Sequence, residues 1–179
     1  MKIIKTETIS ETKWLSLKYK IYLDKNKNEK KWEYVERVNN TKAVIIIPED
    51  RKNNYYILIK QYRLPFENYV IEFPAGLIDK DETIEQTAKR EIIEETGFCG
   101  EIMSISPLLS TSSGLTTESI YIVKMEIDIS KKNNQKLEPS EDIEILILDK
   151  NSIKNSLIKY SQQNIIIDSK VWLYFFNNL

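Results

Sequence analysis

The 179-residue sequence contains no histidine and a single cysteine, Cys99. The missing histidine excludes Ser-His-Asp and Cys-His catalysis and any histidine-ligated zinc site. A single cysteine excludes an intrachain disulfide and a Cys-x-x-Cys redox motif. Acid, base and metal chemistry would therefore come from carboxylates, hydroxyls, Lys, Arg, Tyr or backbone groups. Oxygen ligands of this kind suit Mg²⁺, Mn²⁺ or Ca²⁺.

The sequence also lacks an excess of charge of either sign, because 26 Lys and Arg stand against 27 Asp and Glu. We therefore expect neither a nucleic acid nor a membrane as a partner. There is no run of about 18 apolar residues, and MKIIKTETIS does not read as a signal peptide. We expect an intracellular protein, in the cytoplasm or the nucleus. With 41% hydrophobic and 30% charged residues, the chain is typical of one globular domain with a small N-terminal extension.

Alternation of apolar and polar residues predicts several of the strands. From Leu15 to Leu23 apolar residues occupy every second position, which predicts a strand with one buried face. The polar run DKNKNEK (24–30) predicts a turn before a return strand. Strands wrapped around central and terminal helices predict an α+β or a three-layer α/β/α architecture. The predicted strands are 15–23, 32–38, 42–48, 55–63, 69–73, 102–109, 119–127 and 143–148, and the predicted helices are 83–96, 152–160 and 169–177.

The segment GLIDKDETIEQTAKREIIEETGF (76–98) contains the most distinctive of these helices. Thr83 followed by Gln86 is the pattern of a capping box, which predicts the first turn. Gly97 is suited to the left-handed position that follows a helix. These signals predict a helix over 83–96 that carries several glutamates.

Two of these glutamates fall on the face that should be buried. At about 100° per residue, Glu91 and Glu95 lie on the same side as the apolar stripe of Ile84, Ala88 and Ile92. A like-charge pair at this spacing costs about 0.2–0.5 kcal/mol even when exposed, and burial adds to the cost. A divalent cation would turn the repulsion into attraction. No EF-hand pattern is present, so the helix favours a Mg²⁺-type site over structural Ca²⁺.

The same segment carries a longer motif. Gly76, five residues, Glu82, seven residues and then REIIEETGF, which ends at Phe98, match GX5EX7REUXEEXGU, where U is aliphatic or aromatic. Every fixed position is filled, so the segment resembles the Nudix box. The resemblance implies a Nudix hydrolase, an α/β/α sandwich that cleaves a nucleoside diphosphate linked to another moiety. In that family the box forms a loop-helix-loop that holds Mg²⁺ or Mn²⁺ against the pyrophosphate.

The flanking sequence narrows the resemblance. QYRLPFENYVIEFPAGLID (61–79) is similar to ADP-ribose pyrophosphatases and, most closely, to eukaryotic ADP-sugar diphosphatases. The likeness extends to KWLSLKYKIYLD, KWEYVERV, SSGLTTESIYIV and SEDIEI, and so covers most of the chain. It implies a β-hairpin extension over 1–38, for dimerisation and substrate stacking, and a Nudix hydrolase domain over 39–179. It also implies a homodimer that exchanges its N-terminal strands.

The resemblance implies a metal site of oxygen ligands. Glu91 and Glu95, together with the carbonyl of Ala75, match the principal metal ligands of the family. Glu94 and Glu82 match further ligands or hydrogen-bond partners.

Two residues match groups that support the metal site. Arg90 matches a guanidinium that orients the box carboxylates. Glu141 matches a loop glutamate that completes the metal site or positions the attacking water, and Glu138 or Glu144 are alternatives for it. Glu141 or a box glutamate would serve as the catalytic base.

The substrate contacts are implied in the same way. Trp14 and Trp32 match two tryptophans that sandwich the adenine, and in an exchanged dimer they come from different chains. Ser112 stands where eukaryotic relatives have an aspartate that contacts substrate, and Ser113 where many ADP-ribose pyrophosphatases have proline. This departure concerns the terminal sugar rather than the ADP. The other matching substrate contacts are Glu33, Arg37, Arg63, Glu72 and, through its backbone, Leu77.

We therefore expect Mg²⁺-dependent hydrolysis of the pyrophosphate of ADP-ribose or a related ADP-sugar, giving AMP and a sugar phosphate. Mn²⁺ is the alternative metal. Another nucleoside diphosphate sugar, a dinucleotide or an oxidised nucleotide are alternative substrates. A Nudix-fold module that binds its ligand without cleaving it, and a hydrolase that also supports ATP synthesis from ADP-ribose, are further alternatives.

Overall fold

A computed structural model describes residues 1–176. The chain forms two compact units, each of which draws on separate stretches of sequence. The first unit consists of 1–43 and 107–121, and the second consists of 44–106 and the residues from 122 onward. Residue 177, the last of the predicted helix 169–177, lies outside the described residues.

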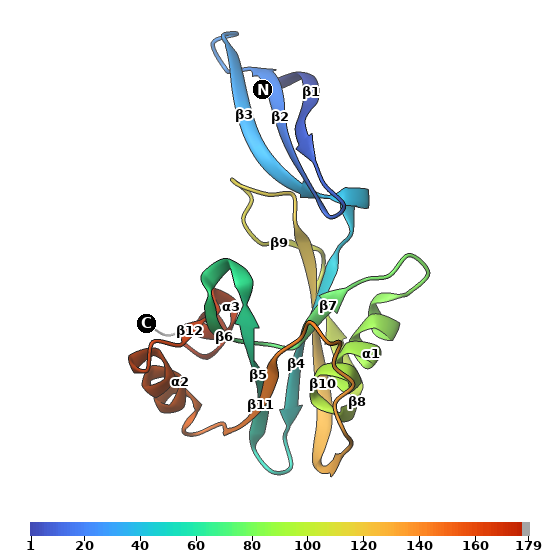
Figure 1. Ribbon diagram of the computed structural model, residues 1–179, viewed down its shortest axis with the longest axis vertical. Coiled ribbons are helices and arrows are strands. Elements are labelled where there is room, and N and C mark those ends of the chain that lie inside the picture. Colours follow the sequence, from blue (N-terminus) through green and yellow to red (C-terminus); the bar gives the residue numbers. More distant parts are fainter. Residues whose placement is uncertain (177–179) are drawn as a thin grey trace. The chain divides into compact units, whose positions relative to one another are not determined.

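The first unit is built on an antiparallel sheet in the order β1-β2-β3 (Figure 1). β2 has the predicted bounds, whereas β1 was not predicted. Its sequence KIIKTETISE lacks a regular alternation, and its ladder with β2 is irregular between Ile3 and Lys5 and between Thr8 and Ser10. The elements of this unit are β1 (Lys2–Glu11), β2 (Leu15–Leu23), β3 (Glu29–Arg37), a 3₁₀ turn (Val38–Asn40), β9 (Leu109–Ser110) and the first residues of β10.

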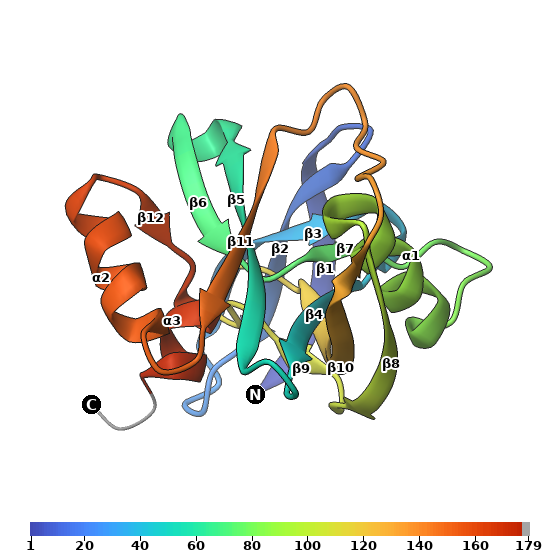
Figure 2. The ribbon, with the colours of Figure 1, turned by 90° about the horizontal axis from the view of Figure 1, so that it is seen from below.

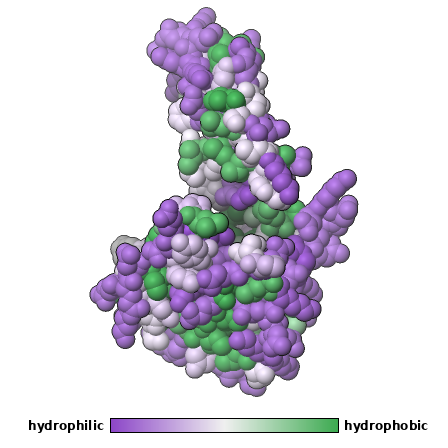
Figure 3. Space-filling view, in the orientation of Figure 1, coloured by the Kyte–Doolittle hydropathy of each residue, from purple (hydrophilic) through white to green (hydrophobic). Residues whose placement is uncertain are grey.

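The predicted buried face of β2 is wrong. Leu15 and Leu17 are 45% and 38% exposed, whereas Ser16 between them is 1% exposed. Apolar residues are interspersed with polar ones on the surface of this unit, as Figure 3 shows. Alternation fixes which residues share a face of the strand, but the side that becomes covered depends on what packs there.

The second unit holds the remaining elements. β7 was not predicted, and the helix predicted over 83–96 is confirmed with its cap at Thr83. The elements are β4 (Ala43–Asp50), β5 (Tyr55–Arg63), a 3₁₀ turn (Leu64–Phe66), β6 (Asn68–Glu72), β7 (Ala75–Leu77), α1 (Ile84–Thr96), β8 (Phe98–Ile105), β10 (Ser119–Lys132), β11 (Ile143–Asp149), α2 (Ile153–Gln162), β12 (Ile166–Ile167) and α3 (Ser169–Phe175).

The strands of the second unit form a mixed sheet in the order β12-β6-β5-β4-β10-β8, with β11 paired to β5 and β7 to β4. The pair β12–β6 is parallel, and the pairs β5–β6 and β5–β11 are antiparallel. No helix within residues 1–176 is long and apolar enough to cross a membrane.

Helices cover both faces of this sheet. Ile57 on β5 packs with Ala88 and Ile92 of α1 in the buried core. The neighbouring Tyr56 points to the other face, where its ring lies 5.0 Å from that of Phe175 in α3. Figure 2 shows α1 on one side of these strands and α2 and α3 on the other. The predicted α+β fold with three layers is confirmed.

Candidate active site

Local sequence signals position the helix that carries the glutamates. The Thr83 hydroxyl accepts a hydrogen bond from the backbone N–H of Gln86 at 3.2 Å, and Oε1 of the Gln86 side chain accepts one from the Thr83 N–H at 2.8 Å. This is the predicted capping box. At the other end Gly97 has φ 73°, and its N–H donates to the Ile93 carbonyl at 2.8 Å. Both ends of α1 are therefore fixed within a few residues of the acidic side chains.

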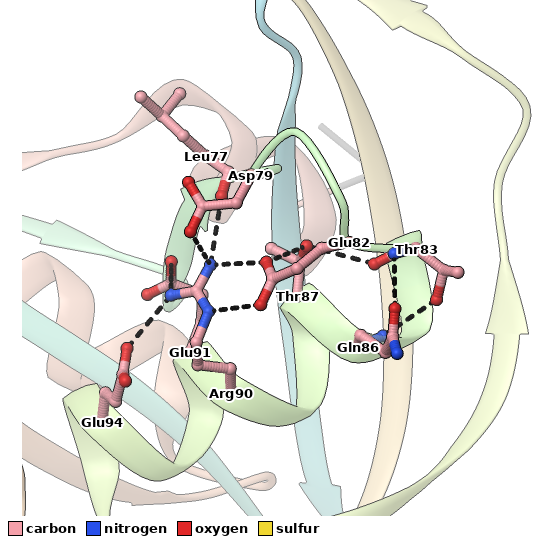
Figure 4. Close-up of polar contacts among 9 residues, drawn as sticks. All are labelled: Leu77, Asp79, Glu82, Thr83, Gln86, Thr87, Arg90, Glu91 and Glu94. Atoms are coloured by element: carbon pink, nitrogen blue, oxygen red, sulfur yellow. Dashed lines mark hydrogen bonds and ion pairs between the residues drawn. The ribbon is translucent and has the colours of Figure 1, made fainter.

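Arg90 is bonded to several acidic side chains of the box (Figure 4). Its Nε and Nη2 donate to the two oxygens of Glu82, each at 2.8 Å. Its Nη1 donates to Glu91 at 2.7 Å and to Glu94 at 3.1 Å, and Nη2 also donates to the Leu77 carbonyl at 3.2 Å. The hydrogen bonds from Arg90 lower the pKa of Glu82 to about 2. The guanidinium therefore fixes Glu82 as an ionised partner and orients Glu91 and Glu94.

Glu95 lies deeper than the carboxylates around Arg90. It is 4% exposed, and its Oε2 accepts a hydrogen bond from the Ala75 N–H at 2.9 Å. Burial raises the pKa of Glu95 to about 8 and that of Glu91 to about 7. The negative charge of Glu141 raises both further. The predicted burial is therefore observed for Glu95, whereas Glu91 is only half-buried. No cation contacts the Glu95 carboxylate directly within the described residues.

The oxygen donors of these residues fit a hard divalent cation. Glu91, Glu95 and Glu141 offer carboxylate oxygens beside the Ala75 carbonyl, the ligand type that Mg²⁺ and Mn²⁺ prefer. A Cβ built on Gly76 would lie 1.7 Å from Oε1 of Glu91, so any other residue here would displace this carboxylate from its present position. Within residues 1–176 no three acidic or cysteine side chains are already arranged around one point as metal ligands.

Arg63 and Glu72 lie on neighbouring strands of the same sheet. Nε and Nη2 of Arg63 donate to the two oxygens of Glu72 at 2.7 and 2.8 Å. This bidentate pair raises the pKa of Arg63, and the charge of Glu95 adds to the effect. The two predicted substrate contacts are thus bonded to one another close to the buried glutamate. Both hydrogens on Nη1 of Arg63 stay outside the pair.

The sequence reasoning did not single out Gln61. It lies two residues before Arg63 on β5 and therefore on the same face of the sheet. Its side chain is 8% exposed, and its carbonyl oxygen has no hydrogen-bond partner in the described part of the chain. A buried acceptor of this kind is costly. The spacing in QYR could have indicated a shared face, but not the burial.

The register of β11 distinguishes Glu144 from Glu141 as the candidate for the loop glutamate. Glu144 pairs with Lys60 across the β5–β11 ladder, and their side chains form an ion pair. Lys60 neighbours Gln61 on the strand, so Glu144 points to the face opposite to Gln61 and Arg63. The charge of Glu141 instead raises the pKa of Glu91 and Glu95. Oε2 of Glu141 accepts a hydrogen bond from the Glu138 N–H at 2.8 Å.

The remaining predicted residues lie in the first unit. Trp32 donates from Nε1 to the Gly114 carbonyl at 3.2 Å. Arg37 donates from Nε and Nη2 to Oε1 of Glu118 at 3.0 and 2.7 Å. Glu118 was not predicted, although it belongs to the stretch SSGLTTES that carries the resemblance.

Three further predicted residues of this unit are surface groups. Glu33 forms an ion pair with Lys31 at 2.9 Å, and its side chain is 58% exposed. The Ser112 carbonyl accepts hydrogen bonds from the N–H groups of Leu115 and Thr116, each at 2.9 Å, which shapes a turn. Trp14 is 64% exposed.

Comparisons with known proteins agree with this geometry. Residues 39–154 match the NUDIX domain family. ADP-ribose pyrophosphatase of Saccharomyces cerevisiae is 35% identical over 95% of this chain and 80% of its own length. ADP-sugar pyrophosphatase of Mus musculus is 32% identical over 94% of this chain and 83% of its own length. The crystal structure of an ADP compounds hydrolase has the same fold, with a TM-score of 0.73 and 23% identity over 88% of this chain and 83% of that chain. The chain therefore belongs to the Nudix family of hydrolases.

Proposed function

We propose that this Nudix hydrolase cleaves the pyrophosphate of ADP-ribose or a related ADP-sugar, giving AMP and a sugar phosphate. The relatives named for ADP-ribose and ADP-sugar pyrophosphatase activity match almost the whole chain. The observation that carries the proposal is the pair of carboxylates on one face of α1, the buried Glu95 and the half-buried Glu91, next to Ala75 and Gly76. Such a pair is costly without a cation and suited to binding one.

Nudix hydrolases generally use divalent metal ions. We propose Mg²⁺, or Mn²⁺ in its place, held by Glu91, Glu95, Glu141 and the Ala75 carbonyl, with Glu94 at the margin of the site. When bound, the ion would neutralise charge on the phosphates and acidify water next to them.

The protein groups would position the reaction and move its proton. Water attacks one phosphorus, a new P–O bond forms, and the bond from that phosphorus to the bridging oxygen breaks. The proton released by the water passes to the carboxylate of Glu141 or of a box glutamate. Arg90 keeps the box carboxylates in place, and Nη1 of Arg63 can donate to a phosphate oxygen.

We assign substrate binding to the residues that match substrate contacts of the family. Trp14 and Trp32 would stack on the adenine, and Arg37 would bind a phosphate or a ribose hydroxyl. Glu72 would hold Arg63 in the orientation that it has here. The remaining proposed substrate contacts are Glu33, Ser112 and the backbone of Leu77. Of these, Ser112 would influence which terminal sugar is accepted.

The register of the first sheet supports a dimeric arrangement. Trp32 lies opposite Lys20, and Trp14 lies just before Leu15 at the far end of β2. The strand from 14 to 20 spans about 20 Å. Two rings that sandwich one base lie about 7 Å apart, so the two tryptophans of one chain are too far apart to do so. We propose that residues 1–38 mediate a homodimer in which the two tryptophans at one adenine come from different chains.

The experiment that tests the activity compares two glutamate variants of the same helix. Glu95→Gln keeps the shape and the acceptor for the Ala75 N–H but removes a ligand charge, so we expect turnover of ADP-ribose to fall at least about 100-fold. Glu85→Gln, on the exposed face of α1, should keep wild-type turnover. AMP is followed by chromatography with Mg²⁺ present, and thermal unfolding in EDTA confirms that both variants are folded.

A wrong substrate and a wrong metal site would give different outcomes. If the wild type releases no AMP from ADP-ribose, a panel of nucleoside diphosphate sugars, dinucleotides and oxidised nucleotides identifies the substrate. If Glu95→Gln is as active as the wild type, the assigned metal site is wrong.

A further inference from the structure

A basic groove lies on the face of the sheet away from α1. It has a volume of about 710 Å³ and is lined by residues of β5, β10, α2 and α3 together with the turn before α2. Tyr56 and Lys124 alternate along their strands with Ile57 and Val123, which pack in the core under α1. The groove and the candidate active site therefore lie on opposite faces.

Lysines converge on this groove from separate elements. Lys150 is paired with Glu49 at 2.9 Å, and Lys170 with Asp168 at 2.6 Å. Lys124 and Lys154 also line the groove.

Neither Lys124 nor Lys154 has an ion pair with a carboxylate of the described residues. Their ammonium groups instead lie over aromatic rings, Lys124 at 5.3 Å from the centre of Tyr174 and Lys154 at 5.4 Å from that of Phe176. Two positive charges therefore remain uncompensated at the groove, in a chain whose net charge is -1.

The walls between these lysines are apolar. Leu173, which is 67% exposed, lines the groove together with Tyr174 and Ile122. Ligand pockets combine such apolar walls with a few converging polar groups, and their volumes are about 300–1,000 Å³.

We propose that this groove binds a small organic phosphate. A phosphate monoester carries a charge of about −1.5 to −2 at neutral pH, which matches the charge of Lys124 and Lys154. The phosphate lies between these two ammonium groups, and the organic part of the ligand packs against Leu173 and Tyr174. The site is separate from the glutamates of α1 and does not depend on the metal there.

Phenyl phosphate is the probe, because it has one ring, one phosphate and no adenine. The ¹⁵N-labelled full chain is titrated in EDTA, and backbone amide shifts are followed by NMR. We expect saturable shifts at Lys124, Leu173 and Tyr174. Phenol, which lacks the phosphate, should leave them unchanged, and binding should weaken as salt rises.

A matched pair of double variants tests the two lysines. Lys124→Gln with Lys154→Gln should weaken binding at least about tenfold, which is 1.4 kcal/mol. Lys25→Gln with Lys30→Gln removes the same charge from exposed positions, one in the turn after β2 and one in β3, and should leave the affinity within about twofold. Leu173→Asp places a carboxylate in the groove without touching the lysines and should also abolish binding.

Three results would overturn the proposal. The first is the absence of saturable shifts at the groove, and the second is equal affinity in the Lys124→Gln, Lys154→Gln variant. The third is equal binding of inorganic sulfate at the same amides, which would mean an adventitious ion only. Amide spectra of each variant show whether it is folded.

Discussion

At the scale of single residues, the acidic side chains of α1 divide into two kinds. Glu82 and Glu94 are held by the guanidinium of Arg90. The Glu95 carboxylate has only the Ala75 N–H as a hydrogen-bond partner among the described residues, and burial raises the pKa of Glu95 to about 8. Glu91 contacts Arg90 and still has a raised pKa of about 7. The two carboxylates with raised pKa are the two assigned as principal metal ligands.

Gln61 gives a residue-scale prediction about stability. Its buried carbonyl oxygen lacks a partner, and an unsatisfied buried group costs about 1–3 kcal/mol. Gln61→Met keeps the length of the side chain and removes this cost, so we expect the free energy of unfolding in urea to rise by about 1 kcal/mol. Because Gln61 shares a face with Arg63, turnover of ADP-ribose should fall in the same variant.

A second glutamine provides the control. Nε2 of Gln135 donates to the Glu95 carbonyl at 2.6 Å and to the Ile143 carbonyl at 3.3 Å, so this glutamine is satisfied. Gln135→Met should lower stability by about 1 kcal/mol. A loss of stability in Gln61→Met would contradict the assignment of an unsatisfied group.

At the scale of elements, the two ends of α1 and the loop that leads to Glu141 constrain the site. The capping box begins the helix, and Gly97 ends it with a left-handed backbone. Residues 133 and 136 are bonded to this end, since Asn133 N–H donates to the Gly97 carbonyl and Lys136 N–H to the Glu94 carbonyl. The loop that leads to Glu141 is therefore attached to the end of the helix that carries the other glutamates.

A pair of glycine variants tests the end of this helix. A Cβ on Gly97 would lie 2.1 Å from the Asn133 carbonyl oxygen at φ +73°, so we expect Gly97→Ala to destabilise the protein by about 2 kcal/mol or more. A Cβ on Gly114 would meet nothing within 4 Å, so Gly114→Ala should stay within about 0.5 kcal/mol of wild type. Urea denaturation measures both, and equal effects would show that the close approach at Gly97 relaxes at little cost.

The element-scale prediction for β2 was only half right. Its bounds follow from local alternation, and they are observed. The face that becomes buried is decided by the neighbours, and Ser16 rather than Leu15 or Leu17 is covered. The exposed leucines are consistent with a surface that another chain covers, which the proposed dimer would provide.

At the scale of the whole molecule, the proposed dimer makes a complementation prediction. Trp14→Ala and Trp32→Ala should each lower turnover in a homodimer, because each removes one ring from both sites. If the two rings at one adenine come from different chains, a mixed dimer of these variants has one intact site and one site without either ring. Random mixing should then restore about a quarter of wild-type turnover.

Light scattering provides the control for this experiment. It should show a dimer for the wild type and for both variants, since the exposed tryptophans are assigned to substrate rather than to the interface. A monomer with full turnover would contradict the exchanged dimer. A dimer without restoration on mixing would place both rings at one site within a single chain.

The sequence by itself determined the features that depend on short-range physics. The capping box, the glycine at the end of α1 and the shared face of Glu91 and Glu95 follow from helical period and from backbone groups a few residues apart. The motif around them also predicted the family, which residues 39–154 confirm. The assigned roles of the individual residues stay predictions.

Tertiary structure alone decided which distant residues meet. The bidentate pair of Arg63 and Glu72 and the opposite orientation of Glu144 depend on strand register, which local patterns do not set. The burial of Gln61 and the convergence of lysines on the α3 face depend on which helix covers which side of the sheet. These features depend on contacts between segments that are far apart in the chain. Such contacts form only when the layers pack together, so local sequence patterns do not reveal them.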